Sequence, residues 1–170
     1  PGCPSDPSFD GGDSSVSNAT HATVPDDLDH FFYLELFSGT GRLFDAIKKK
    51  LSAVGRNEVK VISIDIKNGD DLLQSETFHR VQQLVNSGKC IGVWFAPPCS
   101  SWGTSRRNDG NQYAQPLRSK QHIHGLPHLN DKDRKNVNEA NMLVDRSIKL
   151  AINCILQQVT FVMELSLIHI

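Results

Sequence analysis

Short apolar runs alternate with stretches of helical periodicity along most of this chain. Four runs rich in β-branched or aromatic residues predict buried strands at 31–37, 59–66, 91–96 and 160–164. Between them, apolar residues recur every three or four positions, which predicts helices at 43–54, 75–86 and 136–158. Such alternation predicts an α/β sandwich with a mostly parallel sheet and helices on both faces.

Two segments lack this periodicity. Residues 1–29 are rich in Pro, Gly, Ser and Asp and predict a disordered leader, which leaves 30–170 as the folded domain. Residues 100–135 are polar and predict a loop whose length in a compact domain favours a functional role. With 170 residues in total, the chain is one ordinary domain, without room for a second large one.

Charge and cysteine content exclude several classes of protein. The 18 basic and 19 acidic residues argue against a histone-like polycation and against a wholly acidic disordered chain. No run of about 18 apolar residues is present, so we expect no membrane partner. The four cysteines, Cys3, Cys90, Cys99 and Cys154, form no C-x-x-C pair, so we expect no metal site. This pattern of cysteine use favours an intracellular location, nucleus or cytoplasm, over secretion.

The first predicted strand leads into a glycine-containing turn, Ser38-Gly39-Thr40-Gly41, before a predicted helix. Glycines there let a ligand approach the backbone at the helix N-terminus. Asp65 ends the next strand 24 residues after Gly41, about where a ribose-binding carboxylate is expected. A plain strand-to-helix turn and a helix-capping acid are the structural alternatives.

The segment ELFSGTGRLF resembles motif I of the S-adenosylmethionine-dependent methyltransferases. The resemblance implies that S-adenosylmethionine is the cofactor and that its contacts are Glu35, Ser38, Gly39, Gly41 and Asp65. It implies a Rossmann-like fold of the methyltransferase type, here in a trimmed version. A nicotinamide-dependent oxidoreductase is a more distant alternative, because Phe44 takes the third glycine position of G-x-G-x-x-G.

The same resemblance implies an acidic residue near the adenine ring of the cofactor. Asp70 and Asp71 in NGDDLL are the candidates, and we favour Asp71 with Leu72. An exposed turn before a helix is the alternative for this segment.

The third predicted strand ends in APPCSSWG, in which two prolines fix the backbone before Cys99. A cysteine after proline resembles motif IV of the cytosine-C5 DNA methyltransferases. The resemblance implies that Cys99 adds to C6 of a flipped-out cytosine and that Glu164, after the fourth strand, holds or protonates N3. Pro97 would then contact the cofactor. The alternative is a rigid pocket-lining loop in which Cys99 is unreactive.

Three departures separate the chain from that family. Ser100 follows the cysteine where the family commonly has Gln, Leu165 follows Glu164 where it has Asn, and Arg42 stands where it has Gly. The target-recognition half of the family is not found in the sequence. We therefore expect a C-terminally truncated, partial methyltransferase domain, similar also to methyltransferase-like segments of mobile-element polyproteins.

The loop 100–135 has seven basic and three acidic residues, a local charge of +4. Basic side chains can hold phosphates and aromatic ones can stack on bases, so we expect this loop to contact DNA or RNA. The candidate contacts are Ser101, Trp102, Arg106 and Arg107. A solvated insertion is the alternative.

The sequence thus predicts S-adenosylmethionine-dependent methyl transfer, with cytosine in DNA as the favoured acceptor and Cys99 as the nucleophile. Two alternatives stay open. One is an inactive, methyltransferase-like interaction module within a larger polyprotein. The other is a methyltransferase that acts without covalent catalysis on RNA or another substrate.

Overall fold

The computed structural model describes residues 29–102 and 115–164. Within these residues, four strands and three α-helices alternate. In order they are β1 (Phe32–Leu36), α1 (Arg42–Ala53), β2 (Lys60–Ile64), the 3₁₀ turn η1 (Ile66–Asn68), α2 (Ser75–Asn86), β3 (Cys90–Phe95), α3 (Asp131–Leu156) and β4 (Thr160–Met163). Residues 1–28 of the predicted leader and the candidate contacts Arg106 and Arg107 lie outside the described residues.

The strands and helices fall within two residues of the predicted bounds, with one exception. Helix α3 begins at Asp131, so the last five residues of the predicted loop 100–135 are helical. The side chain of Asn130 caps this helix by accepting a hydrogen bond from the Asp133 amide at 2.9 Å. Two aspartates in the first turn also suit a helix N-terminus. This polar first turn carries no apolar periodicity, which is why the sequence pattern missed it.

All four strands are parallel, in the order β2-β1-β3-β4. The chain leaves β1 in one direction to form β2, then crosses past β1 to form β3 and β4. The predicted α/β fold with a parallel sheet is therefore confirmed, and it is compatible with a Rossmann-like arrangement. The reversal of direction creates a switch point between β1 and β3, where sheets of this kind bind ligands beyond the carboxyl ends of their strands.

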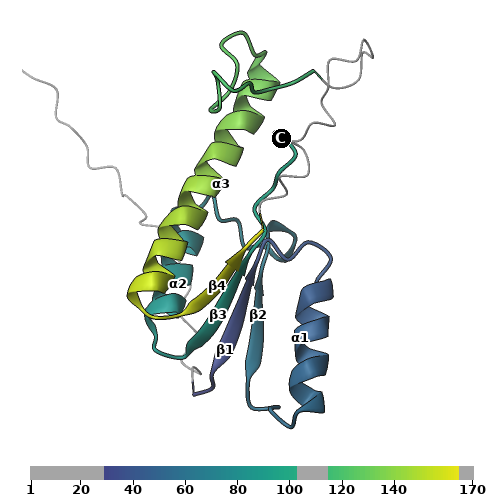
Figure 1. Cartoon of the computed structure of the whole chain (residues 1–170), viewed down its shortest axis with the longest axis vertical. Coiled ribbons are helices and arrows are strands. Elements are labelled where there is room, and N and C mark those ends of the chain that lie inside the picture. The colour runs from purple at the N-terminus through teal and green to yellow at the C-terminus, as the bar shows by residue number, and fades with distance from the viewer. Residues whose placement is uncertain (1–28, 103–114, 165–170) are drawn as a thin grey trace, which may run out of the picture.

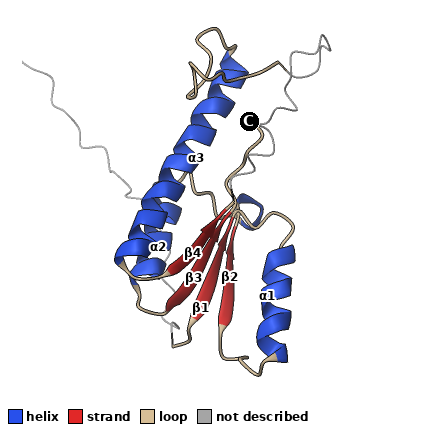
Figure 2. Ribbon diagram, in the orientation of Figure 1, coloured by secondary structure: helices blue, strands red, loops and turns tan. Residues whose placement is uncertain are grey.

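Helices cover both faces of the sheet, with α1 on one side and α2 and α3 on the other (Figures 1 and 2). The core lies between the sheet and the α2–α3 layer. Its fully buried side chains come from β1, β3, α2 and α3 and include Phe32, Leu34, Leu36, Phe95, Val81, Val85, Leu150 and Cys154. None of the described helices combines the length and apolar character needed to cross a membrane.

Helix α3 is longer than the sheet requires. Its amino-terminal part rises beyond the carboxyl ends of the strands (Figure 1). The chain between 115 and 130 forms no helix or strand and folds back at this end of α3. This extension forms a wall beside the carboxyl ends of the strands.

Candidate functional site

The turn after β1 has the backbone conformation that its glycines predict. Gly39 and Gly41 have φ values of 56° and 70°, in the left-handed region that favours glycine. The Gly41 amide donates to the Ser38 carbonyl at 2.9 Å, which closes the turn before α1. Phe37, just before the turn, also has a positive φ of 63°, which is uncommon for a residue with a side chain.

Asp65 connects this turn to the end of β2. Its Oδ2 accepts a hydrogen bond from the Gly39 amide at 2.8 Å, and its Oδ1 accepts one from the Lys67 amide at 2.9 Å. The carboxylate therefore anchors the glycine turn and caps η1, as the capping alternative predicted. Each oxygen can accept a second hydrogen bond, so Asp65 keeps the capacity to bind a ligand.

A cavity of about 510 Å³ opens at the carboxyl ends of β1, β2 and β3. Its volume lies within the range of small-molecule sites. Four of the predicted cofactor contacts line it: Gly39, Asp65, Asp71 and Leu72. An adjoining cavity of about 320 Å³, which shares Gly39, is lined by Ser38 and Gly41 as well. Residues predicted from separate motifs thus come together at one edge of the sheet.

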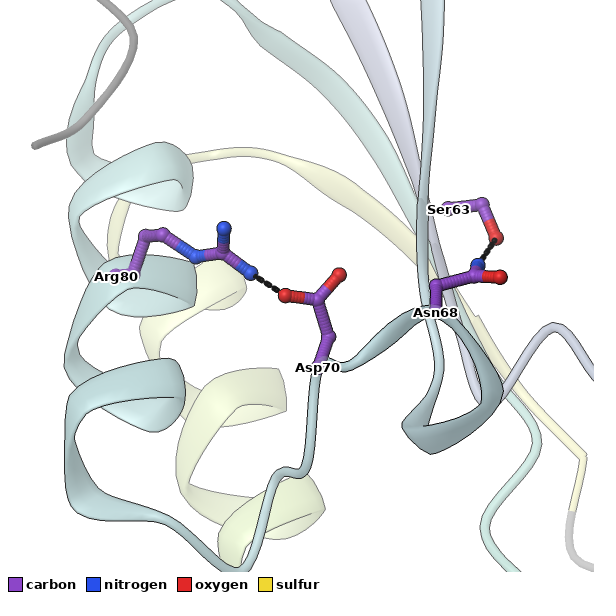
Figure 3. Close-up of polar contacts among 4 residues, drawn as sticks. All are labelled: Ser63, Asn68, Asp70 and Arg80. Atoms are coloured by element: carbon purple, nitrogen blue, oxygen red, sulfur yellow. Dashed lines mark hydrogen bonds and ion pairs between the residues drawn. The ribbon is translucent and has the colours of Figure 1, made fainter. Parts of the chain in front are cut away.

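Two arginines that sequence reasoning missed hold the segment 70–74. Arg80 on α2 forms an ion pair with Asp70, as Figure 3 shows beside the Asn68–Ser63 hydrogen bond. Arg146 on α3 donates to the carbonyl oxygens of Leu72 and Gln74. Neither arginine is close enough in sequence to show its partner by a local pattern.

Within this segment, Asp71 has a local role as well. Its Oδ1 accepts a hydrogen bond from the Leu73 amide at 2.8 Å. Both Asp70 and Asp71 line the cavity of about 510 Å³, but Asp70 is paired with Arg80.

Helix α3 supplies a wall of the cavity that the sequence analysis did not include. Asn136, Glu139, Ala140 and Leu143, at successive spacings of three, one and three residues, lie on the face of α3 that lines it. Phe37 and Ile66 are further lining residues that were missed. The signal in the sequence was two polar residues, Asn136 and Glu139, within the apolar periodicity of α3.

Glu35, near the end of β1, lies behind the glycine turn and is only 4% exposed. Its Oε2 has no hydrogen-bond partner among the described residues. Burial raises the pKa of this carboxyl above its ordinary value, and the nearby Asp45 and Asp65 add to the effect, while a backbone hydrogen bond from Phe44 opposes it. Glu35 is not among the residues that line the two cavities.

The raised pKa of Glu35 predicts a pH-dependent loss of stability. The folded chain binds this proton more tightly than the unfolded chain, so stability falls as pH rises from the ordinary glutamate value through the raised one. We expect Glu35→Gln to be more stable than wild type at pH 7, by on the order of 1 kcal/mol, because it removes a buried charge with an unpaired oxygen. Thermal unfolding at pH 7 and at about pH 4 measures this, since the advantage should vanish once wild-type Glu35 is protonated. An equal advantage at both pH values would contradict the assignment.

The two prolines after β3, Pro97 and Pro98, differ in their exposure and position. Pro97 is buried, whereas Pro98 lines the cavity of about 510 Å³ together with Ala96 and Ser100. Cys99 is half-buried and lies between two lining residues, although it is not itself among them. Cys90 and Cys154 are buried, so Cys99 is the most exposed of the described cysteines. Burial also raises the pKa of Cys90 to about 12 and that of Cys154 to about 11.

Glu164 follows β4 beside the end of β3. Its amide donates to the Phe95 carbonyl at 2.8 Å, and its side chain is exposed. Glu164 and Cys99 thus follow neighbouring strands at the same edge of the sheet, but Glu164 does not line the cavity of about 510 Å³.

Ser101 and Trp102 are engaged in contacts within the protein. The Ser101 hydroxyl accepts a hydrogen bond from Arg118 at 3.0 Å, and the guanidinium carbon of Arg118 lies 3.6 Å from the Trp102 ring centroid. These two predicted substrate contacts are therefore packed against a neighbouring segment.

The fold and the cavity define this chain as a parallel α/β protein with a ligand-sized site at the switch point of its sheet. In the described part of the chain, no group of three or more His, Cys, Asp or Glu side chains could hold a metal ion. Comparisons with protein-family models, with curated proteins and with solved structures find no match to this chain.

Proposed function

We propose that this chain binds S-adenosylmethionine in the cavity of about 510 Å³ and transfers its methyl group, with cytosine in DNA as the acceptor. The charge of the cavity wall is the observation that carries the proposal. Among the described residues, the cavity lining holds four carboxylates, Asp65, Asp70, Asp71 and Glu139, and no Lys or Arg, while Asp70 is paired with Arg80. S-adenosylmethionine carries a sulfonium and an ammonium group against one carboxylate, so it suits such a wall, whereas the two phosphates of a nicotinamide dinucleotide do not.

The lining residues also fit the parts of the proposed cofactor. Ile64, Ile66, Leu72 and Leu143 provide an apolar surface for adenine. The spare acceptor capacity of Asp65 suits the ribose hydroxyls. The N-cap residue of α1, Gly41, has no side chain to bond the first-turn amides, and the amide of Phe44 bonds to Glu35. The remaining first-turn amides, those of Arg42 and Leu43, suit the cofactor carboxylate.

Cys99 is the proposed nucleophile, because it lies between Pro98 and Ser100, which both line the cavity, and we infer that its thiol lies at the cavity rim. Its thiolate would form a bond to C6 of cytosine, and the electron pair of the C5–C6 double bond would take the methyl group from sulfur at C5. Loss of the C5 proton to a base and expulsion of the thiolate from C6 would then restore the aromatic ring. The acceptor base would have to leave the helical stack to reach this rim.

The exposure of the Glu164 side chain favours a second candidate, methyl transfer to RNA or another substrate without covalent catalysis. Without an acid against ring N3, thiolate addition to cytosine is less favourable. The product of the reaction separates this candidate from the first.

Incubation with tritiated methyl-S-adenosylmethionine and either duplex DNA or RNA tests both. We expect the label in DNA, recovered as 5-methylcytosine after digestion. Label in RNA alone would favour the second candidate, and no label in either polymer would contradict methyl transfer to nucleic acid.

A further inference from the structure

Arg118 lies in the predicted nucleic-acid-binding loop, yet its guanidinium group joins three parts of the protein. Nη1 donates to the Ile123 carbonyl at 2.6 Å and to Asn141 Oδ1 on α3 at 2.7 Å. Nη2 donates to Ser101 Oγ at 3.0 Å and to the Val137 carbonyl at 3.4 Å. The group therefore connects the turn after β3, the loop 115–130 and α3.

The same guanidinium group stacks on Trp102, with 3.6 Å between its carbon atom and the ring centroid. This distance is typical of a close cation–π contact. Ser101, its hydrogen-bond partner, is only 5% exposed, and all four acceptors of Arg118 are neutral oxygens. Arg118 is thus committed to contacts within the protein, and we do not count it among the phosphate-binding residues.

A tight turn connects Cys99 to Ser101 and Trp102, the two residues that Arg118 contacts after β3. The Trp102 amide donates to the Cys99 carbonyl at 2.8 Å, so Cys99 and Trp102 are the first and last residues of this turn. Pro97 and Pro98 restrict the backbone on one side of Cys99. Arg118 restricts the other side, because it holds both Ser101 and Trp102.

We infer that Arg118 is a positioning residue, which fixes the Cys99–Trp102 turn and hence the placement of the Cys99 thiol at the cavity rim. The inference rests on the proposed role of Cys99 as nucleophile. A lysine could not replace Arg118, because its single ammonium group cannot stack on an indole and supply a planar set of donors at the same time.

Arg134 provides a matched control. It donates to the Pro127 and Leu129 carbonyls at 3.4 Å and 3.0 Å and so holds the same loop, but within the described part of the chain it makes no hydrogen bond to the Cys99–Trp102 turn. A role of Arg118 in loop stability alone would make Arg118→Lys and Arg134→Lys behave alike.

Steady-state methyl transfer is the first test. We expect Arg118→Lys to lower kcat by about 10- to 100-fold, since small misplacements of a reacting group have effects of this size. The KM for S-adenosylmethionine should change by less than about twofold, because Arg118 does not line the cofactor cavity. Arg134→Lys should keep both values. An unchanged kcat in Arg118→Lys, or equal losses in the two variants, would overturn the inference.

Alkylation of Cys99 by iodoacetamide is the second test and does not depend on methyl transfer. Peptide mass spectrometry resolves the Cys99 rate, which should change by about fivefold or more in Arg118→Lys and stay constant in Arg134→Lys. A constant rate in both variants would overturn the inference. An altered rate in Arg118→Lys, with a wild type that transfers no methyl group, would support the positioning of Cys99 and contradict the proposed function.

A spectroscopic readout and a second variant complete the test. In a Trp94→Phe background Trp102 is the remaining one of the two tryptophans, so its emission reports the stack directly. We expect a red shift in Arg118→Lys, and an unshifted spectrum would contradict the loss of the contact.

If Arg118→Lys does not fold, Ser101→Ala serves as the second variant, because it removes the hydrogen bond between Ser101 and Arg118. It should alter Cys99 alkylation in the same direction.

Discussion

The Cys99→Ala variant should lose methyl transfer to DNA by at least about 1,000-fold, because the step that activates C5 of cytosine needs a thiolate at C6. Its affinity for S-adenosylmethionine should stay within about twofold of wild type, since Cys99 is not among the lining residues of the cavity of about 510 Å³. Filter-based transfer assays and cofactor titration measure the two quantities. Cys3→Ala, which removes a thiol distant in sequence, should retain full activity.

Trapping of a covalent adduct tests the role of Cys99 as nucleophile without a measurement of the methyl-transfer rate. An oligonucleotide containing 5-fluorocytosine cannot lose the group at C5, so the wild-type chain should remain bonded to it in the presence of S-adenosylmethionine. The Cys99→Ala variant should form no such adduct. Transfer at the wild-type rate by Cys99→Ala, with 5-methylcytosine as product, would contradict the covalent mechanism.

The Asp65→Ala variant should lose both cofactor affinity and stability. It removes the acceptor that anchors the Gly39 amide and the cap of η1, which together contribute about 2 kcal/mol. It also removes the carboxylate proposed to hold the ribose hydroxyls, so we expect the Kd for S-adenosylmethionine to rise by about 100-fold. Calorimetry and urea unfolding check the two effects.

Asp145→Ala is the control for this loss of negative charge. Asp145 is an exposed residue of α3 that pairs with Lys149 at 2.7 Å, and such surface pairs contribute at most about 1 kcal/mol. We expect it to bind the cofactor like wild type. If the two variants bind equally well, Asp65 has only its structural role.

The positions of the strands and helices were predictable because their signals are local. The aromatic and β-branched runs that form β1, β2 and β3 and the apolar spacing of α2 depend on neighbouring residues only. The polar ends of helices were harder to predict. Helix α3 begins five residues before the predicted start, because Asn130 and Asp133 form its cap. The ends of parallel strands share one edge of a sheet, so the meeting of Gly39, Asp65 and Ser100 at one cavity also followed from the topology.

What the sequence could not show were contacts between distant segments. Arg146 reaches carbonyl oxygens more than 70 residues earlier in the chain, and the wall formed by Asn136 and Glu139 depends on how α3 packs. Arg118 illustrates the same limit. As a basic residue in a basic loop it is expected to contact phosphate, but in the structure its hydrogen-bond partners are neutral oxygens of the protein. Composition predicts the charge of a segment, but only packing decides which charges face a ligand.

Isothermal titration of S-adenosylmethionine into the purified chain tests the central claim most directly. The account predicts saturable binding at one site with a Kd below about 1 mM in the wild type. It also predicts a strong loss of affinity in Asp65→Ala and none in Asp145→Ala. An absence of binding heat and of any thermal shift in the wild type, or equal binding by all three chains, would contradict it.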